Sequence, residues 1–207
     1  MATNAVIIVA SQGKHVSMFA RVANYLNRNL YKNKAKILKA TVTESGSSLT
    51  VTFRKFDGHS FSWVDVKDIS SILTISHGAI IDGPNLAYGD IGYQPWGTNP
   101  DSDYTELSAE GTSFWSSIGW ELNPVGKIIL VGCSMGKSID DPGNQRAPYG
   151  QLVADTSRRT VYASNGLFAA ADKDTVLRHV KAIERGSAIR PMKRFNPDPK
   201  KANLLDI

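Results

Sequence analysis

Two side chains that can act together as nucleophile and base each follow a short hydrophobic run of this sequence. His77 comes two residues after the run 72–75, and the single cysteine, Cys133, comes two residues after the run 128–131. An imidazole beside a thiol accepts its proton, which makes the sulfur nucleophilic, and later donates a proton to the leaving group. If both runs are adjacent parallel strands, the two side chains emerge side by side at one edge of a sheet.

Glycines flank both candidate residues, and one of them adds a second catalytic element. Because Gly78 has no side chain, its backbone N–H can approach a substrate carbonyl closely. Together with the backbone N–H of Cys133 it would form an oxyanion hole. Removing one such donor costs about 3 kcal/mol of transition-state stabilisation.

The elements that must position these residues alternate between strands and helices. Apolar and alternating runs predict strands over residues 5–10, 37–43, 49–56, 70–75, 127–131 and 160–164. Amphipathic spacing and composition predict helices over residues 15–28, 105–122, 149–157 and 172–185. This alternation indicates an α/β fold with a mainly parallel sheet and helices on both faces, plus a β-hairpin over residues 37–56 in the N-terminal half.

The same pattern predicts the domain organisation. Residues 1–186 are expected to form one domain, because 207 residues fit one domain of ordinary size. The Pro-rich, polar residues 187–207 are expected to form an extended basic tail. Residues 79–103 and 137–148 lack a period and are rich in loop-forming residues, so we expect long loops there, which in compact domains are usually functional.

Composition and charge exclude several classes of protein. With 42% hydrophobic and 21% charged residues, the chain has globular rather than disordered composition. No apolar run approaches the roughly 20 residues of a membrane-spanning helix, and no secretory signal is apparent. We therefore expect no membrane association, and either a cytoplasmic protein or an effector delivered without such a signal.

The net charge of +5 is unevenly distributed, since residues 56–145 contain three basic and twelve acidic residues. The sequence contains no nucleic-acid-binding motif in which basic residues alternate with aromatic ones. We therefore expect a solvated basic surface and no nucleic-acid partner. One cysteine and four scattered histidines give no metal-ligand spacing, and neither a metal nor another cofactor is expected. His15, His59 and His179 are predicted at a helix start, a hairpin turn and a helix surface.

His-Gly after one hydrophobic strand and Cys-x-x-Gly after a later one resemble the caspase-like cysteine peptidases of clan CD, over roughly residues 5–185. The predicted helix 149–157 and the strand after it resemble bacterial toxin-associated members. The resemblance implies a three-layer caspase-like fold and a cysteine endopeptidase that cleaves a protein or peptide substrate. In it, Cys133 would be the nucleophile, His77 the base, and the N–H groups of Gly78 and Cys133 the oxyanion hole. It also implies a role as an effector or toxin domain.

The acidic residues that follow the His-Gly pair motivate a prediction about the substrate. Asp82 and Asp90 lie in this segment and would favour a basic residue before the scissile bond. In the family, a polar or acidic residue often comes close before the cysteine. Here Val131 and Gly132 precede Cys133, so no specificity residue is carried over from that segment.

Three alternatives remain open. The same fold could be a catalytically inactive binding module, with Cys133 packed as a small hydrophobic residue. Gly-Cys-Ser-Met-Gly over residues 132–136 also fits the G-x-S-x-G motif of serine hydrolases, with Ser134 as nucleophile, although that motif runs directly into a helix. Gly-Lys-Ser over residues 136–138 resembles the end of a phosphate-binding loop, which also needs a helix start.

Overall fold

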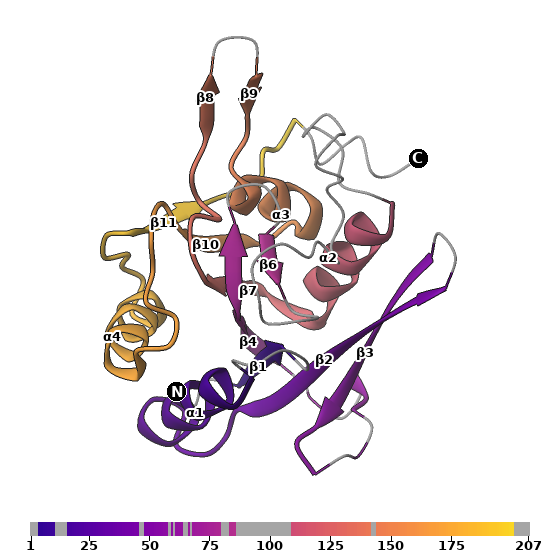
Figure 1. Cartoon of the computed structure of the whole chain (residues 1–207), viewed down its shortest axis with the longest axis vertical. Coiled ribbons are helices and arrows are strands. Elements are labelled where there is room, and N and C mark those ends of the chain that lie inside the picture. The colour runs from indigo at the N-terminus through magenta and orange to yellow at the C-terminus, as the bar shows by residue number, and fades with distance from the viewer. Residues whose placement is uncertain are drawn as a thin grey trace.

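Seven strands form a central sheet in the computed structural model, in the order β11-β10-β7-β4-β1-β2-β3 (Figure 1). The structure describes residues 4–10, 16–45, 48–57, 59, 61–63, 66, 68–79, 83–85, 109–141 and 144–200. The strands of the sheet are β1 (Ala5–Ala10), β2 (Lys36–Ser45), β3 (Ser48–Lys55), β4 (Ile69–Ile75), β7 (Leu122–Val131), β10 (Thr160–Ser164) and β11 (Met192–Phe195). The helices are α1 (Val16–Asn29), α2 (Ala109–Glu121), α3 (Tyr149–Ser157) and α4 (Lys173–Glu184).

The middle of the sheet is parallel and its two edges are antiparallel. Strands β2, β1, β4, β7 and β10 pair in parallel with their neighbours, whereas β3 and β11 pair antiparallel with β2 and β10. Parallel neighbours need a crossover, and helices supply it in the connections from β1 to β2 and from β7 to β10. The α/β fold with a mainly parallel sheet and an N-terminal-half hairpin is therefore confirmed.

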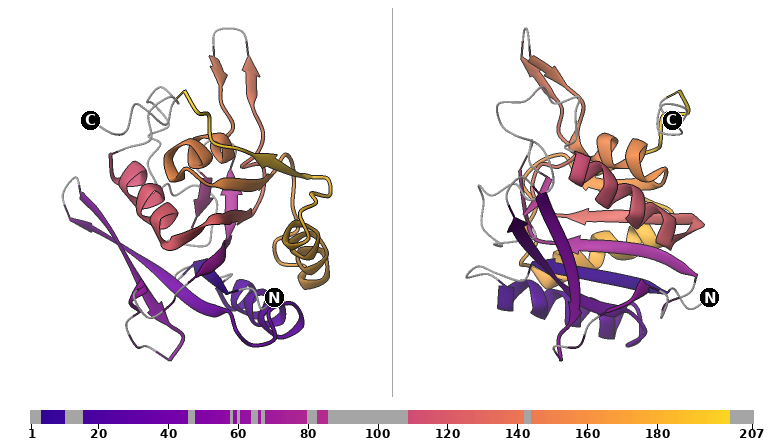
Figure 2. Two further views of the ribbon diagram at one scale, coloured as in Figure 1. Left: turned by 180° about the vertical axis from the view of Figure 1, so that it is seen from behind. Right: turned by 90° about the vertical axis from the view of Figure 1, so that its right-hand side faces the viewer.

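Helices cover both faces of the sheet and make three layers (Figure 2). Successive residues of the central strands point to opposite faces, so Ile128 and Leu130 pack with α2 and α3, while Ile129 and Val131 pack with α1 and α4. All four are fully buried. Burial on both faces explains why these strands are continuous apolar runs without alternation.

A glycine that weakens the helix pattern of α2 is required by the packing of that helix. A Cβ atom on Gly119 would overlap the backbone carbonyl oxygen of Ser157 at the end of α3. The two helices therefore cross with their backbones in close approach, which no larger residue permits. The cost of a glycine in a helix interior, about 1 kcal/mol relative to alanine, is offset by this contact.

Two short hairpins lie in segments that we predicted as loops. Strands β5 (His77–Ala79) and β6 (Gly83–Asn85) form one antiparallel pair, and β8 (Ile139–Asp141) and β9 (Asn144–Arg146) form the other, which projects from the molecule in Figure 1. Each strand has only three residues, mostly polar or glycine. The sequence therefore has no hydrophobic alternation there that would predict a strand. These two loop predictions are corrected over those residues.

The predicted tail also contains a strand of the central sheet. Residues Met192–Phe195 form β11, which pairs antiparallel with β10 from Val161↔Phe195 to Ser164↔Met192. Met192 and Phe195 are buried, while the two basic residues between them are exposed. A boundary at residue 186 therefore does not separate the tail from the domain. This strand could not be predicted from the sequence, because it has only four residues and the middle two are charged.

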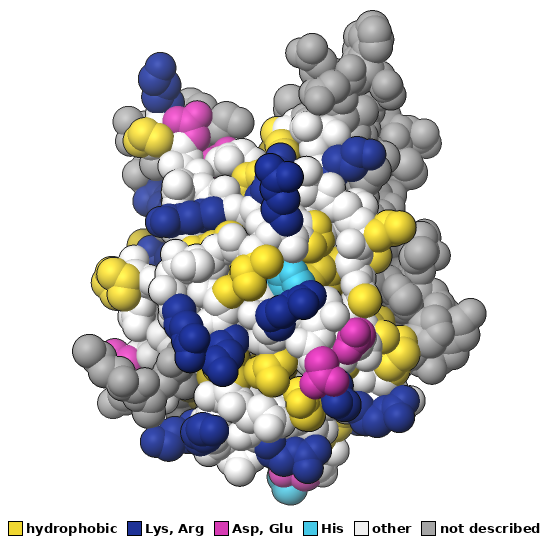
Figure 3. Space-filling view, turned by 90° about the vertical axis from the view of Figure 1, so that its left-hand side faces the viewer, with side chains coloured by type: hydrophobic (Ala, Val, Ile, Leu, Met, Phe, Trp, Pro, Cys, Tyr) yellow, Lys and Arg dark blue, Asp and Glu magenta, His cyan; other side chains and the backbone are white. Residues whose placement is uncertain are grey.

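The side of the molecule that carries α1 and α4 has many Lys and Arg side chains at its surface (Figure 3). Arg21 and Arg28 of α1 and Arg178 and Lys181 of α4 are exposed. They lie on the helix faces opposite to the buried apolar residues, as amphipathic helices require. Within the described ranges, no helix is long and apolar enough to cross a membrane.

Candidate active site

The register of β4 and β7 brings the two candidate residues to the same edge of the sheet. The strands are parallel neighbours, and Ile75 pairs with Val131 as the last pair of the ladder. One more hydrogen bond follows, from the Ser76 N–H to the Val131 carbonyl at 3.2 Å. His77 and Cys133 each come two residues after that last pair. The adjacency that the sequence analysis assumed for the two runs is therefore present in the backbone.

The histidine and its glycine leave the sheet as a short strand. His77 and Gly78 belong to β5, where His77 pairs with Asn85 and Gly78 with Pro84 of β6. This antiparallel pairing fixes the backbone of the His-Gly pair beyond the end of β4. The side-chain position of His77 lies outside the described part of the structure, and so do Asp82 and Asp90 entirely.

The thiol of Cys133 is half-buried and faces the loop that follows β10. Its Sγ atom lies 3.4 Å from the Phe168 carbonyl oxygen, to which it donates, and accepts a hydrogen bond from the Phe168 N–H at 3.4 Å. Both partners are backbone groups. A thiol can use the carbonyl, whereas a thiolate, which only accepts, is stabilised by the N–H. The sulfur therefore contacts one backbone donor and one backbone acceptor.

The turn that carries Cys133 is held by backbone hydrogen bonds to the same loop. The Ser134 N–H donates to the Gly166 carbonyl at 2.8 Å, and the Gly136 N–H donates to the Ser164 carbonyl at 2.6 Å. A Cβ on Gly136 would lie 2.8 Å from the Ala163 carbonyl oxygen, so this close approach requires glycine. The nucleophile candidate thus lies on a turn fixed by the neighbouring strand end.

A histidine that we predicted on a helix surface is buried and fixes this loop. His179 of α4 is 2% exposed, and its ring contacts that of Phe168 edge-on, with the centroids 5.1 Å apart. Its Nδ1 and Nε2 atoms lie 2.8 Å from the Thr175 carbonyl and 3.1 Å from the Arg190 carbonyl. His179 therefore joins α4 to the segment before β11, and its ring packs against the ring of Phe168.

Sequence reasoning missed Phe168 and His179 as parts of the site. Phe168 contacts the sulfur through its backbone, which carries no sequence signal. His179 lies four residues after Thr175 in a pattern that also fits an exposed position, and its second partner comes from outside the helix. Only the fold brings these groups together.

The backbone N–H of Cys133 lies just beyond the end of the parallel ladder. The parallel ladder between β4 and β7 ends at Val131, and no residue of the described structure accepts a hydrogen bond from the Cys133 N–H. The Gly78 N–H belongs to the β5 segment that leaves the neighbouring strand.

The two alternative motifs lack the helix that each of them requires. Residues 134–138 contain a turn and no helix, and β8 follows directly at Ile139, whereas α3 begins only at Tyr149. Ser134 has a φ of +57°, which resembles the strained nucleophile of the serine-hydrolase motif. Without a helix after it, neither that motif nor a phosphate-binding loop is formed.

No cluster of three or more potential metal ligands occurs among the residues that the structure describes. The described part of the site therefore consists of one thiol, backbone N–H groups and the His-Gly segment.

No protein-family model matches the chain, and no curated protein matches it. Among solved structures, a similar chain is that of a secreted C11 cysteine protease from Bacteroides thetaiotaomicron in complex with an irreversible peptide inhibitor. The identity is 10% and the TM-score 0.44, with 88% of this chain and 54% of that chain covered. This chain thus spans about half the length of that protease. A likeness of this degree assigns no activity.

Proposed function

We propose that the chain is a caspase-like cysteine endopeptidase that uses His77 and Cys133 as a catalytic dyad. The observation that carries the proposal is the register of β4 and β7, which sets both residues two positions beyond Ile75 and Val131 at one edge of the sheet. In open α/β sheets, ligands bind at the carboxyl ends of the strands. A substrate at this edge would meet the thiol and the His-Gly segment together.

The reaction would proceed in two steps. The thiolate of Cys133 attacks the carbonyl carbon of the scissile peptide bond, forming a carbon–sulfur bond, while the carbonyl oxygen takes the negative charge. The N–H groups of Cys133 and Gly78 stabilise that oxyanion. The carbon–nitrogen bond then breaks as the His77 imidazolium gives its proton to the leaving amine. Water, deprotonated by His77, hydrolyses the thioester and releases the acid and the thiol.

The surroundings of Cys133 support a nucleophilic rather than a packing role. A cysteine used as a core residue is fully buried among apolar atoms, whereas this thiol is half-buried and lies against a backbone N–H and a carbonyl. The turn beneath it is fixed by hydrogen bonds to the β10 strand end. Preorganisation of this kind favours catalysis because little rearrangement is needed when substrate binds.

The substrate and the biological setting are finer parts of this proposal. The acidic segment after Gly78, with Asp82 and Asp90, predicts a preference for Arg or Lys before the scissile bond. Peptide substrates with Arg, Lys, Leu or Asp at that position would test it, and equal rates or a preference for Asp would contradict it. A role as an effector or toxin domain stays a prediction from the sequence resemblance.

The first experiment is the alkylation of Cys133 by iodoacetamide as a function of pH. A thiolate paired with an imidazole reacts rapidly at neutral pH, where an ordinary thiol is mostly protonated and slow. The wild type should therefore react rapidly at pH 6–7, and His77→Ala should lose that reactivity. The matched control is His59→Ala, which removes an exposed histidine of a turn and should change nothing.

Slow alkylation in the wild type, or equal rates in wild type and His77→Ala, would contradict the dyad. The inactive binding module would then be the better interpretation. Rapid alkylation that depends on His77 would justify a peptide-library screen with the full chain.

A further inference from the structure

The most exposed large apolar residue in the described part of the chain lies beside the candidate nucleophile. Leu167 is 88% exposed and belongs to the loop that follows β10. The Cys133 thiol contacts the same loop through the backbone of Phe168. Isolated exposed apolar residues are common on protein surfaces and need no explanation by themselves. The place of Leu167 next to the thiol therefore decides what its exposure means.

The residues on both sides of Leu167 contact the turn that carries the nucleophile. The Gly166 carbonyl accepts a hydrogen bond from the Ser134 N–H at 2.8 Å, and the Phe168 N–H donates to the Cys133 Sγ at 3.4 Å. Two covalent bonds join the Phe168 nitrogen to the Leu167 Cα, and together they span at most about 2.9 Å. The Leu167 Cα therefore lies within about 6 Å of the sulfur.

The loop holds Leu167 between two anchored neighbours. On one side, the Ser164 hydroxyl donates to the Gly166 carbonyl at 2.8 Å. On the other side, Phe168 is buried, and its ring packs edge-on against the ring of His179. Because the loop is already ordered, little conformational entropy is lost when a ligand contacts Leu167.

The glycine before Leu167 leaves open space at this surface. A Cβ atom on Gly166 would meet no atom of the described structure within 4 Å, and its backbone is not in the left-handed region. Gly136 differs, because a Cβ there would lie 2.8 Å from the Ala163 carbonyl oxygen. Neither packing nor backbone conformation thus explains the glycine at position 166. A residue without a side chain leaves room for a ligand beside Leu167.

A peptide bond that the sulfur attacks brings its neighbouring side chains to the same place. In a reactive complex the two reacting atoms lie about 3–3.5 Å apart. The Cα atoms on either side of the scissile bond are one and two covalent bonds from the carbonyl carbon, so both lie within about 6 Å of the sulfur. The Leu167 side chain begins within the same distance. A side chain of the substrate and that of Leu167 would therefore meet there.

We infer that Leu167 and the open surface of Gly166 form an apolar subsite, which binds a large aliphatic or aromatic side chain of the substrate next to the scissile bond. The contact removes apolar surface of both side chains from water, which is favourable. The inference rests on the proposed function, because it names a substrate feature for the same site. It adds a second feature to the basic residue that Asp82 and Asp90 predict.

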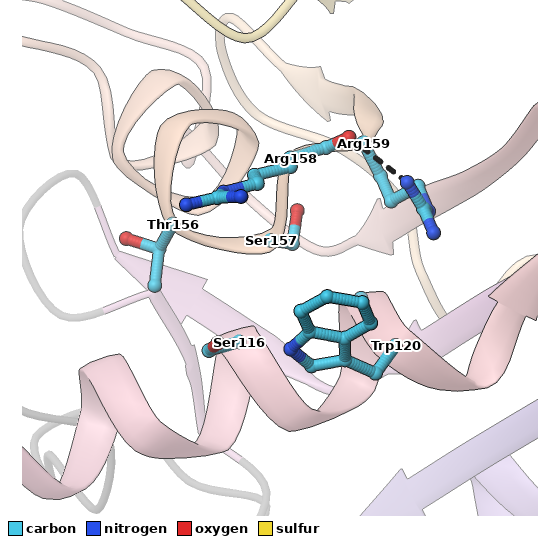
Figure 4. A pocket seen from close by; sticks show the side chains of 7 residues that line it. Ser116, Trp120, Thr156, Ser157, Arg158 and Arg159 are labelled. Atoms are coloured by element: carbon cyan, nitrogen blue, oxygen red, sulfur yellow. Dashed lines mark hydrogen bonds between the residues drawn. The ribbon is translucent and has the colours of Figure 1, made fainter. Parts of the chain in front are cut away.

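Another exposed apolar side chain lies at the opposite end of the strands and provides a comparison. Trp120 lines a cavity of about 280 Å³ between the ends of α2 and α3 (Figure 4). These helices lead into the first residues of β7 and β10, whereas Cys133 follows the last residue of β7. A variant of Trp120 therefore removes an exposed apolar side chain without changing the surroundings of the sulfur.

The contact can be tested without hydrolysis, because Cys133 is the only cysteine of the chain. The full chain is alkylated with two iodoacetamides whose nitrogen carries a hexyl group or an equally long ether chain. In both reactions the sulfur forms a bond to the methylene carbon and iodide leaves, so only the tails differ. In the wild type we expect the hexyl reagent to react at least about fivefold faster, because its tail lies on apolar surface. The ratio of the two rates cancels the reactivity of the sulfur itself.

Three variants separate the subsite from a structural effect. Leu167→Ala should lower the ratio to about one, since little apolar surface remains there. Leu167→Met should keep the ratio high, because an apolar side chain of similar size is restored. Trp120→Ala is the matched control and should keep the wild-type ratio. The Tm of the two Leu167 variants should stay at the wild-type value, because the residue is exposed.

Hydrolysis is measured in parallel with two internally quenched peptides, Gly-Gly-Leu-Arg-Gly-Gly and Gly-Gly-Arg-Leu-Gly-Gly. Each is compared with a peptide that has Ala in place of Leu. At one of the two positions, Leu should raise kcat/KM at least about tenfold, which corresponds to about 1.4 kcal/mol. In Leu167→Ala this advantage should fall to about threefold or less.

Three outcomes would overturn the inference. Equal rates for the hexyl and ether reagents in the wild type would show that no apolar surface lies beside the sulfur. A hexyl preference that persists in Leu167→Ala would place the apolar contact elsewhere. Cleavage of the Leu and Ala peptides with equal kcat/KM would show that the substrate does not use it.

Failure of the proposed function gives a different pattern. If alkylation does not depend on His77 and no peptide is cleaved, the dyad is contradicted. A hexyl preference that still disappears in Leu167→Ala would then support the apolar subsite in an inactive binding module.

Discussion

Strand β7 runs in continuous register with β4 from Lys127 to Val131, and the two ends of this ladder hold polar groups in different ways. At its amino end, Lys127 donates to Glu184 at 3.1 Å, and their side chains are 19% and 9% exposed. The second carboxylate oxygen of Glu184 accepts a hydrogen bond from the buried Tyr31 hydroxyl at 2.8 Å. At the carboxyl end, the half-buried Cys133 thiol meets only the backbone of Phe168.

The difference separates structural polar groups from chemically available ones. The amino-end network joins the end of α4, Lys127 of β7 and the turn after α1, and its two charges neutralise each other. Each of its members therefore stabilises the fold and has little left to offer a ligand. Cys133 has no charged partner in the described structure, and its sulfur contacts only backbone groups. We expect mutations at the two ends to change different observables.

The largest expected effect is the loss of activity in Cys133→Ala. If the dyad hydrolyses peptides, removing the nucleophile should reduce kcat by about 10³-fold or more, since covalent catalysis ends. The Tm should change little, because the thiol makes only weak hydrogen bonds. Peptide hydrolysis and thermal unfolding measure the two quantities. The matched control is Ser134→Ala, which should keep full activity; loss of activity there instead would favour the serine-hydrolase interpretation.

The opposite pattern is expected for Glu184→Gln. Removing one partner of a buried ion pair leaves Lys127 with an uncompensated charge, which typically costs about 3–5 kcal/mol. For a chain of this size, the Tm should fall by about 10 °C. Thermal unfolding measures the fall, and kcat per folded molecule, measured below the transition, should stay at the wild-type value.

A double substitution tests whether the loss comes from the unpaired charge. Lys127→Met combined with Glu184→Leu removes both charges, so its stability should exceed that of Glu184→Gln. If the double variant is the less stable one, packing rather than charge explains the amino-end network. If Glu184→Gln also abolishes kcat, the two ends of the ladder between β4 and β7 are coupled and the comparison fails.

Much of the fold could be predicted because the central strands are buried on both faces. Runs such as residues 128–131 are apolar at every position, and the predicted strand over residues 160–164 matches β10 at both ends. Helix α3 likewise begins and ends where its sequence pattern does. Local composition fails for β11, since half of its residues are exposed and basic at the edge of the sheet.

Only those residues of the candidate site that their immediate sequence neighbours mark out could be predicted. His77 and Cys133 each follow an apolar run, and the topology of parallel strands brings such strand ends together. Phe168 and His179 act through contacts that depend on the loop after β10 and on Arg190, which no spacing in the sequence encodes. Contacts between residues more than 100 positions apart, such as Tyr31 and Glu184, could not be predicted from the sequence either.

The smallest expected effect concerns the pH dependence of the amino end. Burial, and then the nearby Glu184 carboxylate, raise the pKa of Tyr31 well above 10. A raised pKa in the folded state means that the neutral hydroxyl stabilises the fold fully below the unfolded-state pKa, and that this stability is lost as pH rises above about 10.

Tyr31→Phe should therefore lower the free energy of unfolding by about 1.5 kcal/mol at pH 8. The difference in this free energy between the variant and the wild type should become smaller above pH 10. Urea unfolding between pH 8 and pH 11 measures it. Tyr25→Phe is the surface comparison: the hydrogen bond to Asp174 raises the pKa of Tyr25 in the same direction, but its hydroxyl is exposed, so the change with pH should be smaller. A gap that stays constant with pH would show that the Tyr31 hydroxyl ionises equally in both states, and the network of Tyr31, Glu184 and Lys127 would then not be closed.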